Sequence, residues 1–490
     1  MKDELPNGWT TAPLDSICEK IRGVSYKREE ASTVQRRGYL PILRANNIDS
    51  DRLSFTDLVW VPSSRVGAHQ RIRSGDVVVA VSSGSKSVVG KTAQALTDWD
   101  GAFGAFCGVL RPILPLNSRY FGLFLCTREY RNHISDLAAG SNINNLKNEH
   151  FAAIEVPLAP LSEQERIVVK LERLLAKVGQ CHLRVEKIFK FLKRFRQSVL
   201  SAACSGRLTA DWREEHIGEC LVSSKQASSR SNSQIEEIVD TPDEWTWVTL
   251  DFLCNPNRSI CYGVIKLGIE HDQGVPCLRT SDVKPLRIDT VGVKRIDPLI
   301  SNQFGRTVLR GGEVLVNVRG TLGGVAVVPP ELNGWNISRE VAVVPVVDAD
   351  HEFIAFWIAS LSAQGWLTSV VKGVAYSGIN IEDLRQLPVA LPSLTEQEEI
   401  VRRVKNLLAL ADKIEGRYMT VQRQVDSLPQ SILAKAFRGE LVPTEAELAE
   451  REGRPYESAE QLLRRIRVST EGFNHSISRK DSRRRDNVAR

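Results

Sequence analysis

The chain contains two copies of one long segment, and this internal repeat constrains its fold more than any other feature. The stretch from Leu161, LSEQERIVVKLERLLAKV, returns 233 residues later from Leu394 as LTEQEEIVRRVKNLLALA. The same offset relates QSVL at residues 197–200 to QSIL at residues 430–433. Self-similarity over such a length predicts two copies of one structural unit within a single chain.

The regions that precede these segments repeat more loosely. The pairs are GWTTAPLDSIC (8–18) with EWTWVTLDFLC (244–254), LPILRANNID (40–49) with VPCLRTSDVK (275–284), and SGDVVVAV (74–81) with GGEVLVNV (311–318). Short Val- and Ile-rich runs bounded by Gly, Pro, Ser or Asn are typical of strands and turns. Each half therefore reads as a mixed α/β domain followed by one long helix.

The repeated segments have the pattern of a coiled coil. Each opens with a predicted capping box, Ser162 to Glu165 and Thr395 to Glu398, in which a hydroxyl and a glutamate satisfy free backbone N–H groups. Apolar residues then alternate at spacings of four and three, as in a coiled-coil seam. The first seam is Ile167, Leu171, Leu174, Val178, Cys181, Val185, Ile188, Leu192, Phe195 and Val199, and the second is Ile400, Val404, Leu407, Ala411, Ile414, Tyr418, Val421, Val425, Leu428 and Ile432.

Each seam needs a partner, and the other seam is the only comparable one in the chain. We therefore expect an intramolecular antiparallel pair, with an ordinary helix on a globular core as the alternative for either copy alone. Pro429 is expected to kink or open the second helix near its end. The predicted fold class is α+β: two α/β domains joined by two long helices that form an antiparallel coiled coil, with a pseudo-twofold internal repeat.

The predicted domain boundaries follow from these patterns. The serine-rich stretch SSKQASSRSNSQ at residues 223–234 is too polar to pack and is typical of a flexible linker. The expected segments are a first α/β domain at 1–158, a first helical spacer at 159–216, the linker at 217–240, a second α/β domain at 241–391, a second helical spacer at 392–442, and a helical and basic tail at 443–490.

The composition argues against a disulfide-rich secreted protein and against a membrane-spanning protein. A net charge of +6 permits a polyanionic partner without requiring one. The nine cysteines form no CxxC pair, and the N-terminal MKDELPNGW lacks an apolar signal run, so we expect reduced thiols in the cytoplasm. No apolar stretch approaches the roughly 18 residues that a membrane span requires.

A short pattern at residues 84–93, GSKSVVGKTA, resembles a phosphate-binding loop but fails by one residue. The motif requires glycine where Ser85 stands, because the loop wraps its N–H groups around one phosphate before the lysine reaches the next. The second copy reads RGTLGGVAVV and contains no Gly-Lys pair. We therefore predict a glycine-rich turn between two strands, and an NTPase that depends on Lys91 remains the weaker alternative.

Known catalytic patterns are absent from the sequence. We find no Asn/Asp-Pro-Pro-aromatic run, no glycine-rich cofactor loop after a strand, no HExxH, no GxSxG and no His/Cys spacing suited to a metal. The sequence therefore predicts a binding protein without catalytic residues, metal or cofactor.

The duplicated arrangement resembles the specificity subunit of type I restriction-modification systems. The resemblance rests on two diverged domains, each followed by a helix that opens PLSEQE or PSLTEQE and closes QSVLSAACSGRL or QSILAKAFRGEL, and on the tail LVPTEAELAEREGRPYESAEQLLRRI. It implies two target recognition domains that each read one half of a split site on double-stranded DNA. It also implies helical regions that act as a spacer and dock two methyltransferase subunits. Cofactor binding, methyl transfer, translocation and cleavage would belong to those subunits and to restriction/translocase subunits.

Polar and basic loop residues are the candidate DNA readers, because Arg and Asn pair with guanine and adenine edges while Lys, Ser and Thr more often hold phosphates. In the first domain they are Arg44, Asn46, Asn47, Ser83, Ser85, Lys86, Lys91, Asn142, Asn144 and Lys147. In the second they are Arg279, Thr280, Ser281, Lys284, Asn317, Arg319, Thr321, Lys372, Tyr376, Ser377 and Asn380. The candidate partner-binding residues are Glu163, Glu165, Glu396 and Glu398. A coiled-coil adaptor that binds only protein is the alternative function.

Overall fold

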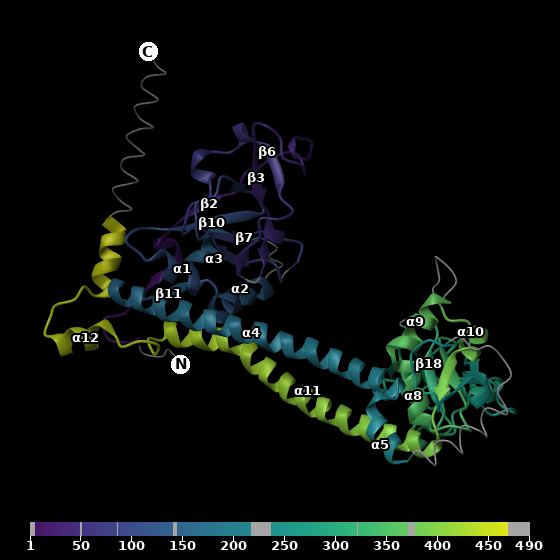
Figure 1. Cartoon of the computed structure of the whole chain (residues 1–490). Coiled ribbons are helices and arrows are strands. Elements are labelled where there is room, and N and C mark those ends of the chain that lie inside the picture. The colour runs from purple at the N-terminus through teal and green to yellow at the C-terminus, as the bar shows by residue number, and fades with distance from the viewer. Residues whose placement is uncertain are drawn as a thin grey trace. The chain divides into compact units, whose positions relative to one another are not determined.

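The computed structural model describes residues 5–49, 51–85, 87–140, 145–216, 237–320, 322–370 and 378–468. The chain divides into two compact units (Figure 1). Unit 1 is Met1–Arg184 together with Val421–Arg490, and unit 2 is Val185–Thr420. Each unit therefore combines one α/β domain with one half of each long helix. The predicted linker at 217–240 lies largely outside the described residues, which resume at residue 237.

The α/β domain of unit 1 is built from short sheets. A four-stranded antiparallel sheet has the order β2 (Cys18–Arg22), β10 (Cys107–Pro112), β7 (Val77–Ala80) and β8 (Thr92–Gln94). A three-stranded sheet has the order β6 (Val59–Pro62), β3 (Tyr39–Leu43) and β9 (Ala102–Phe103). Smaller pairs are β1 (Thr10–Pro13) with β11 (Glu155–Leu158) and β4 (Ile48–Asp49) with β5 (Arg52–Leu53). The helices are α1 (Ser118–Phe124), α2 (Arg128–Gly140) and α3 (Asn148–Ala152).

Unit 2 repeats this strand order. Its four-stranded sheet runs β13 (Cys261–Tyr262), β21 (Val341–Val344), β18 (Val314–Asn317) and β19 (Val325–Val327), and its three-stranded sheet runs β17 (Arg295–Ile296), β14 (Val275–Leu278) and β20 (Asn336–Ile337). The smaller pairs are β12 (Thr246–Thr249) with β22 (Pro388–Leu391) and β15 (Val283–Lys284) with β16 (Arg287–Ile288). The helices are α7 (Pro298–Gln303), α8 (His351–Ala359), α9 (Leu361–Ser369) and α10 (Ile381–Arg385).

The two units share one topological detail that argues for duplication. In each three-stranded sheet one pair is parallel, β3 with β9 and β14 with β20, whereas the other named pairs are antiparallel. The central strands β7 and β18 are buried along their whole length, which is why they read as runs of valine rather than as alternating patterns. The predicted α+β class with an internal repeat is confirmed.

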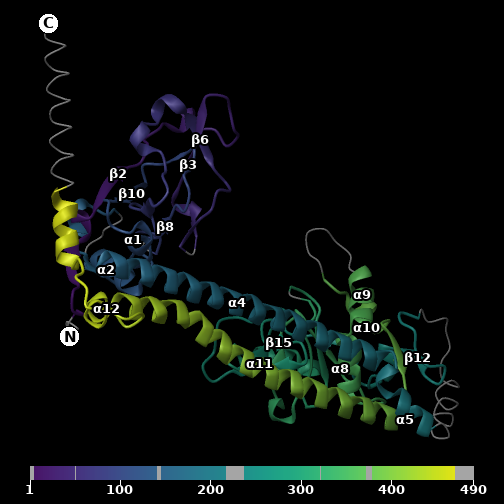
Figure 2. The ribbon, with the colours of Figure 1, turned by 60° about the vertical axis from the view of Figure 1, so that its left-hand side comes forward.

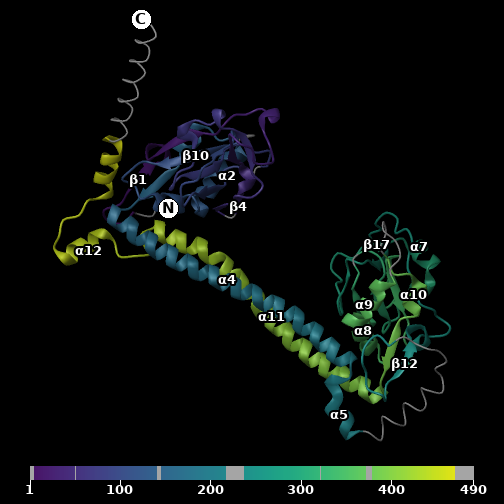
Figure 3. The ribbon, with the colours of Figure 1, turned by 45° about the horizontal axis from the view of Figure 1, so that its top comes forward.

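The long helices α4 (Leu161–Cys204) and α11 (Leu394–Phe437) contain 44 residues each. In unit 2, Phe189 stacks on Tyr418 with ring centroids 5.8 Å apart, and Arg196 lies 2.6 Å from both Asp412 and Glu415. Rising numbers on α4 thus meet falling numbers on α11, which confirms the antiparallel pair. Within each unit the two helices lie side by side in every view (Figure 2, Figure 3).

The apolar stripe of the predicted seam is only partly buried between the helices. Every seventh position of α4, such as Val178, Val185 and Leu192, is buried, as the coiled-coil pattern requires. The alternate line is exposed at Cys181, Ile188, Ile414, Val421 and Leu428. The predicted coiled coil is present, but its apolar stripe is wider than the contact between the helices, because two helices cover only the line that faces the partner and leave the flank of the stripe open.

Both helices begin one residue before the predicted caps, at Leu161 and Leu394. Ser162 and Thr395 therefore lie inside the first turn, and the predicted capping boxes are wrong. In the second copy the hydroxyl of Ser393 accepts the N–H of Glu396 at 3.2 Å instead. Helix α11 continues through Pro429 to Phe437, so the proline does not end the helix, and the expected kink there stays a prediction.

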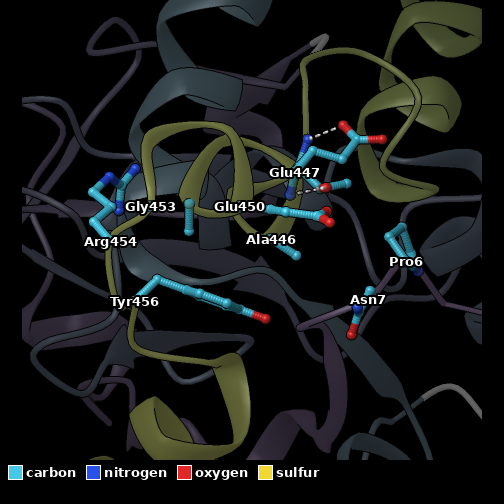
Figure 4. Close-up of a pocket in the computed structure, with 10 residues that line it drawn as sticks. Pro6, Asn7, Ala446, Glu447, Glu450, Gly453, Arg454 and Tyr456 are labelled. Atoms are coloured by element: carbon cyan, nitrogen blue, oxygen red, sulfur yellow. Dashed lines mark hydrogen bonds between the residues drawn. The ribbon is translucent and has the colours of Figure 1, made fainter.

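The tail forms part of unit 1. Helix α12 (Glu445–Glu452) begins with a capping box in which Thr444 and Glu447 exchange hydrogen bonds (Figure 4). Residues 459–468 are helical, and Ala459 donates its N–H to the carbonyl of Gly8 at 2.9 Å. Between the N-terminal segment and α12 lies a hollow of about 780 Å³, lined by Pro6, Asn7 and Tyr456 among others (Figure 4).

Candidate nucleic-acid interface

The fold brings two of the predicted groups of DNA readers together in each unit. In unit 1, Ser82 pairs with Asn145 in an isolated bridge, and Leu146 donates its N–H to Val81 O at 2.7 Å. This contact joins the loop after β7, which carries Ser83 and Ser85, to the segment before α3, which carries Lys147.

Unit 2 repeats this juxtaposition. Arg319 pairs with Gly378, and Ile379 donates its N–H to Val318 O at 2.8 Å. The loop after β18 therefore adjoins the segment that leads to Asn380, the residue before α10. In each copy these two loops are more than fifty residues apart in the sequence. Only the fold therefore reveals that they form one surface.

Lys91 lies where the loop returns into β8, next to a conformationally restricted glycine. Strands β7 and β8 pair antiparallel on either side of the loop, so the predicted turn between two strands is confirmed. Gly90 has φ +76°, and a Cβ there would lie 2.4 Å from Cγ2 of Ile134. This glycine is explained by the turn itself, because other residues seldom adopt that φ and have no room for a side chain.

The first predicted group is held together by internal hydrogen bonds. Arg44 Nη2 and Asn46 Nδ2 both donate to Asp57 Oδ2 at 2.9 Å. Asn47 is buried, and its amide donates to the carbonyls of Ser54 and Thr56 at 3.1 and 2.7 Å. Asn47 therefore fixes the loop, and its side chain does not face solvent.

The equivalent group of unit 2 behaves in the same way. Arg279 Nε lies 3.2 Å from Asp282 Oδ2, and the hydroxyl of Ser281 donates to the same carboxylate at 2.8 Å. Asn317 is buried, and its amide donates to the carbonyls of Thr280 and Val283. Lys284 is half-buried on β15.

Other residues of the predicted set are exposed to solvent. Lys147 and Asn380 stand at equivalent positions and are exposed. Arg319 is exposed, and its guanidinium lies 5.8 Å from the ring centroid of Tyr262, within cation–π range. Seven predicted residues lie outside the described part of the chain, namely Lys86, Asn142, Asn144, Thr321, Lys372, Tyr376 and Ser377.

The structure adds candidates that the sequence analysis missed. A hollow of about 780 Å³ in unit 1 is lined by Lys20 and Arg22 from β2 and by Asn145, Lys147 and Asn148, among others. Lys20 and Arg22 stand two residues apart, which places them on one face of a strand. The alternation of Lys20 and Arg22 in the strand sequence CEKIR could have pointed to this basic face. No sequence pattern pointed to Tyr262, whose ring lies under the guanidinium of Arg319.

The predicted partner-binding glutamates divide into two kinds. Glu163 is fully buried and accepts hydrogen bonds from Trp9 Nε1 at 3.0 Å and from the N–H of Glu445 at 2.8 Å. Burial raises the pKa of Glu163, and these bonds oppose the rise.

Glu396 repeats this arrangement in unit 2. It is buried, and it accepts hydrogen bonds from Trp245 Nε1 at 3.1 Å and from the hydroxyl of Thr209 at 2.7 Å, while Arg213 pairs with it. Glu165 and Glu398 are exposed. Of the four glutamates, only this exposed pair is available to a partner.

The glutamine of the repeated Glu-Gln pair has a structural role as well. Gln164 Oε1 accepts the N–H of Asn117 at 3.1 Å, and Gln397 Oε1 accepts the N–H of Asp350 at 2.8 Å. Asn117 and Asp350 are the N-caps of α1 and α8. The motif thus fastens the start of each long helix to its own α/β domain.

Within the described ranges, no three His, Cys, Asp or Glu side chains gather as a metal site would require. In the same ranges, no helix combines the length and apolar character needed to cross a membrane. All eight cysteines there are free.

Comparison with known proteins identifies the family. The family model described as the type I restriction modification DNA specificity domain matches residues 6–180 and 264–421. The chain is 38% identical over 445 residues to the type I restriction enzyme EcoKI specificity subunit of Escherichia coli (strain K12), covering 89% of this chain and 90% of the relative. It is 36% identical over 448 residues to the StySPI specificity subunit of Salmonella potsdam, covering 90% of each chain.

Solved structures share the fold. A chain from a study of complex assembly and conformational transition of the type I R-M system aligns with a TM-score of 0.59 and 19% identity, covering 89% of this chain and 99% of that one. The HsdS subunit from Thermoanaerobacter tengcongensis aligns with a TM-score of 0.52 and 19% identity, covering 89% and 98%. By its family model and its relatives, the chain belongs to the family of type I restriction-modification specificity subunits.

Proposed function

We propose that this chain selects the DNA site of a type I restriction-modification complex, with each α/β domain reading one half of a split site on double-stranded DNA. The observation that carries the proposal is that equivalent loop positions on two matching scaffolds hold different side chains. Ser82 corresponds to Arg319, and Lys147 corresponds to Asn380. One scaffold with two sets of loop residues is what an asymmetric bipartite site requires.

The chemistry of the exposed loop residues supports this assignment. Arg319 suits the O6 and N7 edge of guanine, and Asn380 suits the N6 and N7 edge of adenine. Lys147, with Lys20 and Arg22 beside it in the hollow of unit 1, suits phosphate oxygens. Arg44, Asn46, Ser83, Ser85, Lys91, Arg279, Thr280, Ser281 and Lys284 remain candidates for further contacts, whereas Asn47 and Asn317 would act by shaping their loops.

Two methyltransferase subunits would dock on equivalent surfaces of the two long helices. Ile188 and Val421 are equivalent positions, and each side chain is 43% exposed. Cys181 and Ile414 form a second exposed equivalent pair. An apolar line left open on both helices suits a further helix packed against each, and the exposed Glu165 and Glu398 offer matching charges.

The catalytic steps would belong to other chains. The methyltransferase subunits would supply methyl transfer, and the restriction/translocase subunits would supply translocation and cleavage, so this chain needs no cofactor or metal of its own. We place the complex in the cytoplasm, where it would meet the DNA that it modifies.

Mapping of methylated bases in cells that carry the complex tests the proposal. The expected result is a bipartite methylated motif. Exchange of residues 1–155 for the same region of a relative should change one half-site and leave the other intact, because each domain carries its own readers. A motif that changed in both halves would refute the assignment of one domain to each half-site. Absence of DNA binding with methyltransferase subunits present would favour the protein-binding adaptor.

A further inference from the structure

A basic hollow lies on unit 2, where the last third of α4 meets the start of α9. Its volume is about 650 Å³, and it is lined by Lys190, Lys193, Arg194 and Arg207 together with polar side chains that include Gln197 and Ser198. Leu361, the first residue of α9, closes one side. All the residues named here belong to unit 2.

Within the part of the chain that the structure describes, no carboxylate neutralises these four cations. Residues 187–207 contain no Asp or Glu, and among the described residues none of the four forms an ion pair. Arg196 provides the contrast, because it faces α11 and pairs with both Asp412 and Glu415 at 2.6 Å. The cation that serves the helix pair therefore has carboxylate partners, whereas the cations that line the hollow have none among the described residues.

The basic residues that line the hollow are not repeated in the second copy. The positions of α11 and its C-terminal end that correspond to Lys190, Lys193, Arg194 and Arg207 hold Arg423, Asp426, Ser427 and Glu440. Two of the four cations are thus replaced by carboxylates. A partner that binds both copies alike would need the same side chains on both, so the hollow serves a different ligand from the one that docks on the repeated apolar line.

We infer that the hollow binds the phosphate backbone of duplex DNA and that α4 holds DNA as well as spacing the two domains. Unpaired Lys and Arg beside Ser and Gln donors are the side chains that make most phosphate contacts in protein–DNA complexes. Unit 2 also carries the second α/β domain, which reads DNA under the proposed function, and the inference rests on that function. The contact is independent of base sequence because phosphates carry no sequence information.

The test is the salt dependence of DNA binding by the assembled complex with its methyltransferase subunits. Lys190→Ala/Lys193→Ala is compared with Lys413→Ala/Arg417→Ala, which removes the same charge from exposed positions of α11 in the same unit. Each complex is titrated with a duplex that carries the methylated motif and with a scrambled duplex.

For the Lys190→Ala/Lys193→Ala complex, we expect the logarithm of the DNA association constant to fall less steeply with the logarithm of the salt concentration. The slope should be smaller in magnitude by about 1.8, since each phosphate contact contributes about 0.9. At about 0.15 M salt this corresponds to binding that is about 30-fold weaker for both duplexes. The control should keep the wild-type slope, and Lys190→Arg/Lys193→Arg should restore it because the charge is kept.

An unchanged slope in the Lys190→Ala/Lys193→Ala complex would overturn the inference. Loss of a protein subunit from that complex with an unchanged slope would overturn it too, and would assign the hollow to an acidic protein surface. If the wild-type complex failed to prefer its own motif, the proposed function would fail, while the slopes on scrambled DNA would still decide whether the hollow binds phosphates.

Discussion

Trp9 and Glu163 are joined by a buried hydrogen bond in which the indole Nε1 donates to Oε1 at 3.0 Å, and the pair recurs as Trp245 and Glu396 at 3.1 Å. The tryptophan precedes the first strand of each domain, and the glutamate lies in the first turn of the long helix that follows it. The third partner differs, because Glu163 also accepts the N–H of Glu445 from the tail, whereas Glu396 also accepts the hydroxyl of Thr209.

Replacement of Glu163 by Ala should destabilise unit 1. The change leaves Trp9 Nε1 and the N–H of Glu445 buried without an acceptor, and such a loss costs about 1 to 3 kcal/mol of unfolding free energy. Urea denaturation followed by tryptophan fluorescence measures the loss. Glu165→Ala is the control, since Glu165 is exposed and should change stability by less than about 0.5 kcal/mol. Equal stabilities for the two variants would show that the buried bond contributes nothing.

The unfolding free energy of unit 2 should depend on pH through Glu399, which lies near the start of α11. Hydrogen bonds from Arg402, with a further bond from Arg403, lower the pKa of Glu399 from 4.5 to about 2 against the effect of burial. A carboxyl whose folded pKa is depressed stabilises the fold above its unfolded pKa and loses that contribution as pH falls through the folded value. The contribution of Glu399 should therefore be complete above about pH 5 and absent below about pH 2.

Glu399→Gln tests this expectation. The variant should be less stable than the wild type at pH 7, and the difference should shrink steadily between pH 5 and the lowest pH at which the protein stays folded. Glu398→Gln is the neighbouring control, because Glu398 is exposed. A stability difference for Glu399→Gln that stayed constant with pH would contradict the role of its charge.

The fold was largely predictable because its signals are local. The stretch Val77–Ala80 is buried throughout and reads as a valine run, and the repeated helices carry their own apolar period. The exact start of each helix was less accessible. Ser162 and Thr395 resemble N-caps by type, but the turn begins at Leu161 and Leu394, because the Glu and Gln that follow are drawn inward to Trp9, Trp245 and the N-caps of α1 and α8.

The candidate site was predictable by residue type but not by orientation. Asn47 and Arg319 both occur in polar loops beside a strand, yet Asn47 turns inward to the carbonyls of Ser54 and Thr56 while Arg319 lies exposed over Tyr262. Which way a loop side chain turns depends on backbone groups that the fold brings near it. For the same reason the sequence did not reveal the hollow around Lys190, since only tertiary contacts show that no carboxylate of the described residues pairs with its cations.

Docking of methyltransferase subunits should depend on the exposed apolar line of the long helices. Ile188→Glu with Val421→Glu places a charge on the equivalent position of both helices and should reduce co-purification of these subunits at least tenfold, because a charge is costly in an apolar contact. Leu183→Glu is the matched control. Leu183 is 61% exposed on α4, and its equivalent in the second copy is Gly416, so it does not belong to the repeated line.

Circular dichroism and urea denaturation should first establish that the double variant stays folded. Full recovery of both methyltransferase subunits by the folded Ile188→Glu/Val421→Glu protein would show that the exposed apolar line does not bind them. Equal loss with Leu183→Glu would indicate a general effect of charge on the helices rather than a specific surface.

The length of the helix pair should set the gap between the two half-sites. Each helix contains residues of both units, since α4 passes from Arg184 to Val185 and α11 from Thr420 to Val421 without a break. Insertion of one heptad after Val185 and one after Tyr418 preserves the seven-residue period of the seam. It lengthens each helix by about 10 Å, which corresponds to roughly three base pairs of B-DNA.

The methylated motif of this variant should keep both half-sites and gain about three unspecified base pairs between them. The contacts of Phe189 with Tyr418 and of His182 with Asp426 each lie wholly within one unit, so the insertion leaves both in place. A seven-residue insertion within residues 223–234 is the control and should leave the gap unchanged, because that stretch lies outside both long helices. If the heptad variant methylated the original motif with its original gap, the length of the helices would not set the gap. The spacing would then have to come from the α/β domains or from the methyltransferase subunits.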